Sequence, residues 1–268
     1  MLRNALSLVM VVLILGGCSQ HANVTAVKPA LGAVTVAGDT AQATAALDAA
    51  VDQLTRSYYQ QVPEAATYNG APAELGSEAH ARFNDRSVAG DMARVVEMEK
   101  RLAALKGTSS NPLSDEQRRV RATLITLFDG ALAPTRVADY GSSFDVYGTW
   151  FLPYAITQNS GVTVDIPKLM EAQQNVRNAD EAKQYLARLE SLPGILDGAL
   201  AKMRHDVALG VIPPDFIIHK AKVVVDAFAA IPASENVLYA SFVGKLQTAN
   251  VSDADIYSAK ALSLVDQG

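Results

Sequence analysis

The sequence of 268 residues has few of the side chains from which reactive sites are built. It contains one Cys, one Trp and four His, and aromatic residues make up only 6% of it. A single Cys excludes an internal disulfide framework. The formal net charge of −5 gives no electrostatic reason to expect a nucleic-acid partner. With 49% hydrophobic residues, the chain is instead typical of a folded globular protein.

Sequence motifs of catalysis and metal binding are also missing. The four histidines are His21, His80, His205 and His219. None has a second His within five residues, whereas a zinc-binding helix of the His-Glu-x-x-His type needs two His four residues apart. Neither a Gly-x-Ser-x-Gly nucleophile turn nor a Gly-rich phosphate loop occurs. We therefore expect solvated or capping imidazoles, no catalytic or metal-binding residue, and no cofactor in this chain.

The first 17 residues have the pattern of an export signal. Arg3 provides a positive start, and residues 5–15 form an apolar run. That run is too short for a membrane span, which takes about 20 residues. Residues 1–17 are therefore predicted to be a signal peptide.

A lipid-attachment motif closes this signal. Its residues are Leu15, Gly16, Gly17 and Cys18, the pattern of a bacterial lipobox. The Cys thiol receives the acyl chains, such as palmitate, and each buried methylene contributes about 0.8 kcal/mol to membrane binding. We predict a lipoprotein of the bacterial cell envelope, anchored to a membrane through Cys18 and facing the periplasm. The alternative is that Cys18 is an ordinary small residue at the end of the signal.

The rest of the chain divides into a flexible tether over residues 18–40 and an all-helical domain over residues 41–268. Apolar residues recur at helical spacing in several stretches. The first stripe is Leu47, Val51, Leu54 and Tyr58; the second is Met92, Val95, Val96, Glu99, Leu102 and Leu105; the third is Val120, Leu124, Leu127, Phe128 and Ala131. Ser114 with Gln117, and Asn178 with Glu181, match the capping pattern of a helix start.

The remaining stretches follow the same pattern. Helices are predicted after Asn178, where Pro193-Gly194 interrupts or kinks the helix, and after Pro213-Pro214. Ser234 and Ser252 are predicted to cap two final helices, and residues 67–87 are predicted to be a loop. Strand signals are nearly absent. The predicted fold class is all-α.

One segment is unusually aromatic. Residues 140–154 read YGSSFDVYGTWFLPY and hold six aromatic side chains. Rings on a Gly-broken segment line a groove for a peptide or glycan in some proteins, and plug the core between helices in others. We take Tyr147, Trp150 and Tyr154 as the candidate ligand-facing rings and leave both alternatives open.

Three motifs of the second half occur in a familiar order. They are YLARLESLPG at residues 185–194, Met203-Arg204, and GVIPP at residues 210–214. In this order they resemble the amino-terminal helical half of the domain-of-unknown-function-885 (DUF885) family, bacterial envelope proteins that are often lipoproteins. The resemblance covers about residues 45–265. It implies half of a carboxypeptidase-like helical fold.

The resemblance also implies what this half lacks. Relatives are usually much longer, and their carboxy-terminal half carries a His-Glu-x-x-Pro-Gly-His motif, for which they are regarded as zinc peptidases. The sequence ends at Gly268 without this motif, so no zinc ligand or catalytic Glu is carried over. The expectation is a chain that is inactive alone and has an exposed apolar face that self-associates or binds a partner chain. The alternatives are a stand-alone helical binding lipoprotein that uses residues 140–154, and an enzyme with an unrecognised site.

Overall fold

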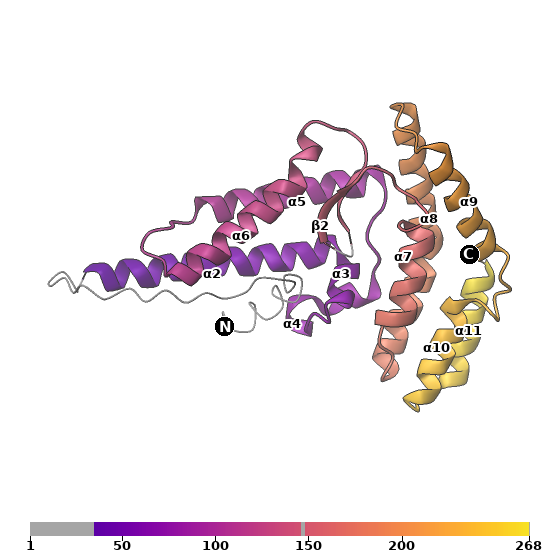
Figure 1. Ribbon diagram of the computed structural model, residues 1–268. Helices are drawn as coiled ribbons and strands as arrows, with labels where there is room; N and C mark the ends of the chain where they lie inside the picture. The colour runs from indigo at the N-terminus through magenta and orange to yellow at the C-terminus, as the bar shows by residue number, and fades with distance from the viewer. Residues whose placement is uncertain (1–34, 146–147, 268) are drawn as a thin grey trace, which may run out of the picture.

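The computed structural model describes residues 35–145 and 148–267, which form two groups of helices (Figure 1). The elements are α2 (Thr35–Gln61), α3 (Pro63–Tyr68), α4 (Ala73–Gly76), η1 (Ser77–Ala81), α5 (Val88–Gly107), α6 (Asp115–Leu132), η2 (Pro134–Arg136), β1 (Ser142–Asp145), β2 (Gly148–Leu152), α7 (Val162–Lys168), η3 (Leu169–Gln173), α8 (Ala179–Ala208), α9 (Asp215–Ala229), α10 (Val237–Thr248) and α11 (Ala254–Gln267). The predicted all-α class is confirmed.

Several predicted residues fall outside the described ranges. These are the lipobox residues Leu15, Gly16, Gly17 and Cys18, and Tyr147 of the aromatic segment. Within the described ranges, no helix has both the length and the apolar character needed to cross a membrane.

The first helical group consists of α2, α5 and α6, which lie side by side (Figure 1). Leu47 and Leu54 of the predicted stripe are buried in its core. Helix α2 begins at Thr35, earlier than the predicted start at residue 41. Near its other end, Tyr58 packs edge-on against Phe128 of α6, with ring centroids 6.1 Å apart.

The predicted apolar stripe of α5 is partly wrong. Met92 and Val96 are 64% and 68% exposed, and the buried face of α5 instead contains Arg94 and Met98 together with the predicted Leu102. These three recur at four-residue spacing on one helix face. The buried face of α5 was predicted wrongly from the sequence, because it includes the charged Arg94.

The predicted start of α6 is confirmed. The backbone amide of Gln117 donates to the Ser114 hydroxyl at 3.2 Å, and the Ser114 amide donates to the Gln117 side chain at 3.0 Å. The two residues thereby satisfy amides that have no partner within the helix.

The second helical group contains α7, α8, α10 and α11, with α9 at its outer side (Figure 1). Asn178 caps α8 as predicted, because its side chain accepts hydrogen bonds from the amides of Asp180 and Glu181. The helix continues through Pro193 to Ala208, so Pro193 does not interrupt it. Tyr185 joins α8 to α10: its ring stacks on Phe242 at 4.4 Å.

Helix α8 ends in a glycine turn. Gly210 has a φ of 83°, a conformation that favours glycine. The amide of Val211 donates to the carbonyl of Asp206, and the amide of Gly210 to that of Val207. These two bonds form a Schellman motif, which turns the chain towards Pro213-Pro214 and α9.

Other predicted boundaries need correction. Asn236, not Ser234, caps α10, because its side chain accepts from the Leu238 amide. Helix α11 begins at Ala254, so Asp253 rather than Ser252 stands directly before it. The predicted loop over residues 67–87 contains the end of α3, the short helix α4 and η1. These turns are too short to produce a helical period in the sequence.

The aromatic segment forms a small antiparallel hairpin, which the sequence did not predict. Ser143 pairs with Phe151, and a bulge follows at Phe144, whose φ is 65°. The bulge turns the Phe144 ring into the core of the first group, where it lies 5.6 Å from Phe128. Gly141 precedes the hairpin with a φ of 71°, and a Cβ there would lie 2.6 Å from the Leu152 carbonyl.

Candidate functional site

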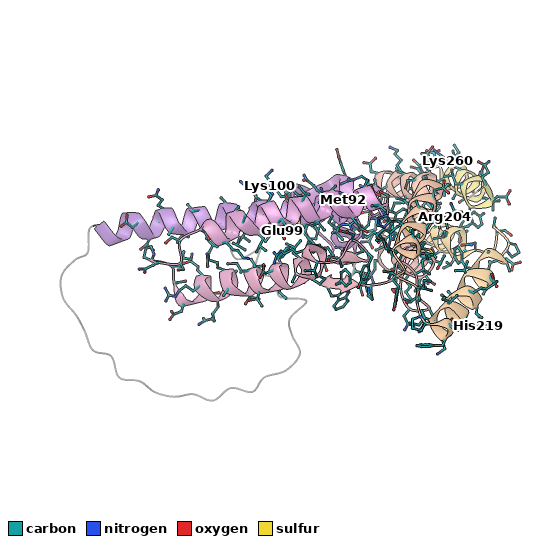
Figure 2. The ribbon with its side chains drawn as sticks, turned by 90° about the horizontal axis from the view of Figure 1, so that it is seen from above. Met92, Glu99, Lys100, Arg204, His219 and Lys260 are labelled. Atoms are coloured by element: carbon teal, nitrogen blue, oxygen red, sulfur yellow. The ribbon has the colours of Figure 1, made fainter. Side chains whose placement is uncertain are left out.

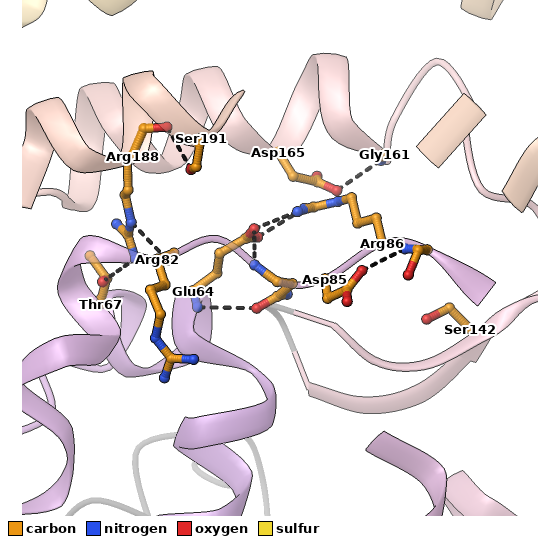
Figure 3. Close-up of polar contacts among 12 residues, drawn as sticks. Glu64, Thr67, Arg82, Asp85, Arg86, Ser142, Gly161, Asp165, Arg188 and Ser191 are labelled. Carbon is orange, nitrogen blue, oxygen red and sulfur yellow. Dashed lines mark hydrogen bonds and ion pairs between the residues drawn. The ribbon is translucent and has the colours of Figure 1, made fainter. Parts of the chain in front are cut away.

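The two helical groups meet around the buried guanidinium of Arg188 (Figure 3). It donates to the Thr67 hydroxyl at 2.8 Å and to the carbonyls of Arg82 and Ala79 at 2.9 and 3.1 Å. It also donates to the side chain of Gln174. Burial lowers the pKa of Arg188 to about 10, so it remains charged at neutral pH. One α8 side chain therefore holds α3, η1 and the segment after η3 together.

His80 belongs to the same junction and has a structural role. Its Nε2 lies 3.1 Å from the Ala71 carbonyl, and its Nδ1 lies 2.9 Å from the Thr67 hydroxyl. A carbonyl only accepts, so Nε2 donates to Ala71. In a neutral imidazole Nδ1 is then the acceptor for the Thr67 hydroxyl, whose oxygen accepts from Arg188. His80 thus ties η1 to α3 and to the segment after it.

A buried ion pair lies beside Arg188. Arg86 donates through both terminal nitrogens to the carboxylate of Glu64, which is fully buried. The Asn84 amide also donates to this carboxylate, at 2.9 Å. Burial by itself raises the pKa of Glu64, but the charge and hydrogen bonds of Arg86 outweigh it, so the pKa lies below its usual value.

A cavity of about 60 Å³, here called the junction cavity, lies next to the Glu64–Arg86 pair. Its polar lining comes from both helical groups and consists of Asn84, Arg86, Asp91, Arg94, Ser142, Asp165 and Lys202. Tyr154 and Ala199 are among the other lining residues. The cavity thus collects charges of both signs from α5 and the segment before it, from α7 and from α8, and a hydroxyl group from the hairpin.

Asp91 is the acidic group at the α5 side of this cavity. Its Oδ1 accepts from Arg94 and, at 2.7 Å, from the Ser142 hydroxyl. No hydrogen bond to its second oxygen, Oδ2, occurs in the part of the chain that the structure describes. Burial raises the pKa of Asp91; the charges of Arg94 and Lys202 and the bond from Ser142 oppose the rise.

Lys202 is the basic group at the α8 side. Its Nζ donates to both carboxylate oxygens of Asp206, at 2.6 and 2.7 Å, and both side chains are 6% exposed. Asp206 also accepts from the Gly141 amide at 3.4 Å. An ammonium group has three N–H donors. Two point at Asp206, so one is left for the cavity.

The three candidate aromatic residues have different surroundings. Tyr154 lines the junction cavity. Trp150 is 54% exposed and is not among the cavity residues, and Tyr147 lies outside the described ranges. A ligand at these rings stays a prediction.

The charged residues of the cavity were not predicted from the sequence. A charged residue within an apolar helix face was the signal that could have identified them. Asp165 interrupts the apolar run from Val162 to Ile166 in α7. Lys202 and Asp206 lie four residues apart on the buried side of α8. Charged side chains are rarely fully buried unless they are paired. Within the described ranges, no group of three or more His, Cys, Asp and Glu side chains could hold a metal ion.

Helix α9 and the segment before it carry an exposed apolar surface, here called the α9 surface and defined by Ile212, Phe216, Ile218 and Val223. The exposed fractions of these residues are 59%, 61%, 44% and 63%, and Ala221 is the buried residue of the helix. Phe216 and Ile218 lie on opposite sides of α9, because two residues span about 200°. Charged and polar side chains are exposed on the same helix, among them Lys220, Lys222 and Asp226. Large apolar side chains that gather on an exposed element mark an interaction surface.

A separate apolar cavity of about 580 Å³ lies between α9 and the rest of the second group. Its lining includes Val162 and Ile166 of α7, Leu192 and Leu196 of α8, and Val225 and Phe228 of α9. Figure 2 shows His219 at the outer end of α9, away from the first helical group. Both features indicate that α9 packs only loosely on the chain described.

The sequence profile of one family, "Bacterial protein of unknown function (DUF885)", matches residues 63–267. The chain belongs to the DUF885 family. This match confirms the family resemblance based on residues 185–214, whose Tyr185, Arg188 and Gly210 have structural roles in the second helical group. The chain matches no curated protein.

Among solved structures, a candidate lipoprotein from Colwellia psychrerythraea is similar in fold. It matches 84% of this chain with a TM-score of 0.73 and 16% sequence identity. At this identity, the likeness shows the fold alone. The chain spans 38% of the length of that protein.

Proposed function

We propose that this DUF885 chain is a lipid-anchored envelope protein whose helical body is a docking layer for the remaining part of a DUF885 fold. The α9 surface carries the proposal, because a group of large exposed apolar side chains marks a site that another protein surface covers. The length of the solved relative supports it, since 84% of this chain corresponds to 38% of that one. The occupant is thus the rest of the family fold.

Any peptidase-like activity belongs, in this proposal, to the assembled fold rather than to this chain alone. The first support is the sequence, which lacks a zinc-binding helix motif. The resemblance places that motif in the carboxy-terminal half of relatives.

The membrane anchor in this proposal is the lipid on Cys18. Its test is fractionation of cells that produce the full chain: Cys18→Ser moves the protein from the membrane to the soluble fraction, whereas an unchanged distribution overturns the anchor.

The docking role is tested with a photo-crosslinking amino acid at Phe216 of the full chain in its native host. Mass spectrometry of the product is expected to identify a polypeptide with the His-Glu-x-x-Pro-Gly-His half of a DUF885 fold. The matched control is the same crosslinker at Val137, which is 88% exposed and precedes the hairpin. A second copy of this chain, an unrelated protein, a lipid adduct, or no specific product at Phe216 overturns the docking role.

A further inference from the structure

The junction cavity has the size of a small metabolite rather than of a peptide. A bound water needs about 10–15 Å³ of such volume, so 60 Å³ holds about four to six waters. A molecule with about five non-hydrogen atoms fills the same space. The side chain of Asp91 is 15% exposed, which gives solvent a path to the cavity.

The lining residues are complementary to a molecule that carries one positive and one negative charge. Lys202 has one N–H left after its two bonds to Asp206, and this donor needs an acceptor. Asp91 Oδ2 makes no hydrogen bond in the described part of the chain, so this acceptor is available to a donor of a ligand. Both groups are held in place by other contacts, Asp91 by Arg94 and Ser142, and Lys202 by Asp206.

We propose that the junction cavity binds a small zwitterionic amino acid, with its ammonium group on Asp91 and its carboxylate on Lys202. Charge-assisted hydrogen bonds of this kind are about twice as strong as neutral ones. A simple anion leaves Asp91 without a donor, and a simple cation leaves Lys202 without an acceptor. Selectivity for the zwitterion follows, because only a ligand with both charges makes a charge-assisted hydrogen bond to each group. This binding is independent of the α9 surface, which lies at the outer side of the second group.

The test is isothermal titration calorimetry of the full chain with glycine. We expect saturable binding of one glycine per chain, at least tenfold weaker binding of acetate and of methylammonium, and at least tenfold weaker binding of L-leucine, whose side chain exceeds the cavity. Equal affinity for glycine and acetate, or no heat with glycine, overturns the proposal.

Two variants locate the site. Asp91→Asn keeps the shape of the side chain and removes its charge, and is expected to weaken glycine binding at least tenfold. Asp52→Asn is the matched control, an exposed Asp on α2 whose partner is Arg56, and it binds glycine like the unchanged chain.

A second variant tests the location of glycine binding if Asp91→Asn does not fold. Ala199→Val fills part of the cavity from α8 without changing any charge, and is expected to weaken glycine binding at least tenfold while circular dichroism shows a folded helical chain. A folded Ala199→Val chain that binds glycine like the unchanged one overturns the placement of the site.

Discussion

Arg188 and Thr67 are 121 positions apart in the sequence, yet the Arg188 Nη2 donates to the Thr67 hydroxyl at 2.8 Å. The contact joins α8 of the second helical group to α3 (Figure 3). The guanidinium also lies 5.4 Å from the centre of the Phe83 ring. The junction between the groups is therefore held by one cation whose hydrogen bonds are satisfied by carbonyl, hydroxyl and amide oxygens.

Arg188→Met is expected to lower the free energy of unfolding by about 3–5 kcal/mol, since each buried acceptor left without its donor costs about 1–3 kcal/mol. The physical reason is that Thr67, Gln174 and two carbonyls lose a buried donor. Urea denaturation followed by circular dichroism measures the change. Arg204→Met is the control, since Arg204 is exposed on the same helix (Figure 2). Equal stability of the two variants would show that the junction does not depend on Arg188.

The Glu64–Arg86 pair predicts a pH dependence of stability. The pKa of Glu64 lies below its ordinary value of 4.5 in the folded chain, so its ionised form stabilises the fold above that pH. This contribution is lost as the pH falls through the lowered pKa. Glu64→Gln is expected to cost about 3 kcal/mol at pH 7, because it leaves Arg86 without its buried counter-charge.

The stability difference between the unchanged chain and Glu64→Gln should then shrink below pH 4.5. Urea denaturation at several pH values measures it. Glu78→Gln, at an exposed residue of η1, serves as the control and should show a small difference at every pH. A Glu64→Gln difference that stays constant from pH 7 to pH 3 contradicts the prediction.

Local features of this fold could be predicted from the sequence, and long-range ones could not. Ser114 and Gln117 are three residues apart, so their reciprocal capping is visible in four letters of sequence. The helical period likewise located α2 and α8. The α5 stripe was misoriented, because its buried face includes the charged Arg94, which pattern rules assign to solvent.

The candidate site is one of the long-range features that could not be predicted from the sequence. Asp91, Ser142 and Lys202 come from three separate elements, and only the packing of α5, the hairpin and α8 brings them to one cavity. The hairpin itself was missed because β1 is four residues long and has a bulge at Phe144. Such a strand shows no alternation of apolar and polar residues for a pattern rule to detect.

Helix α9 is expected to exchange its backbone amide hydrogens faster than residues 182–202 of α8. The reason is that Ala221 is its buried residue, whereas α8 buries Tyr185, Arg188 and Leu189. Hydrogen exchange followed by mass spectrometry compares both helices in one sample. Phe216→Asp should change the free energy of unfolding by no more than about 0.5 kcal/mol, as is usual for exposed positions. Slow exchange in α9, or a large loss of stability in Phe216→Asp, means that α9 is already covered.

Glycine affinity is expected to rise with pH as Asp91 ionises. Burial raises the pKa of Asp91 above its ordinary value of 3.8, and Arg94 of its own helix, Ser142 of the hairpin and Lys202 of α8 oppose the rise. A ligand ammonium binds the ionised carboxylate, so binding lowers this pKa and releases protons wherever Asp91 is partly protonated.

Calorimetry between pH 4 and pH 7 in buffers of different ionisation heats measures both the affinity and the proton release. The other charged groups lining the cavity, Arg86 and Asp165, are unchanged in Asp91→Asn. Any pH dependence that comes from them persists in that variant, whereas the part that comes from Asp91 disappears. An affinity for glycine that falls with rising pH in the unchanged chain contradicts contact between the ammonium group and Asp91, because protonation of the carboxyl removes the charge that attracts the ligand.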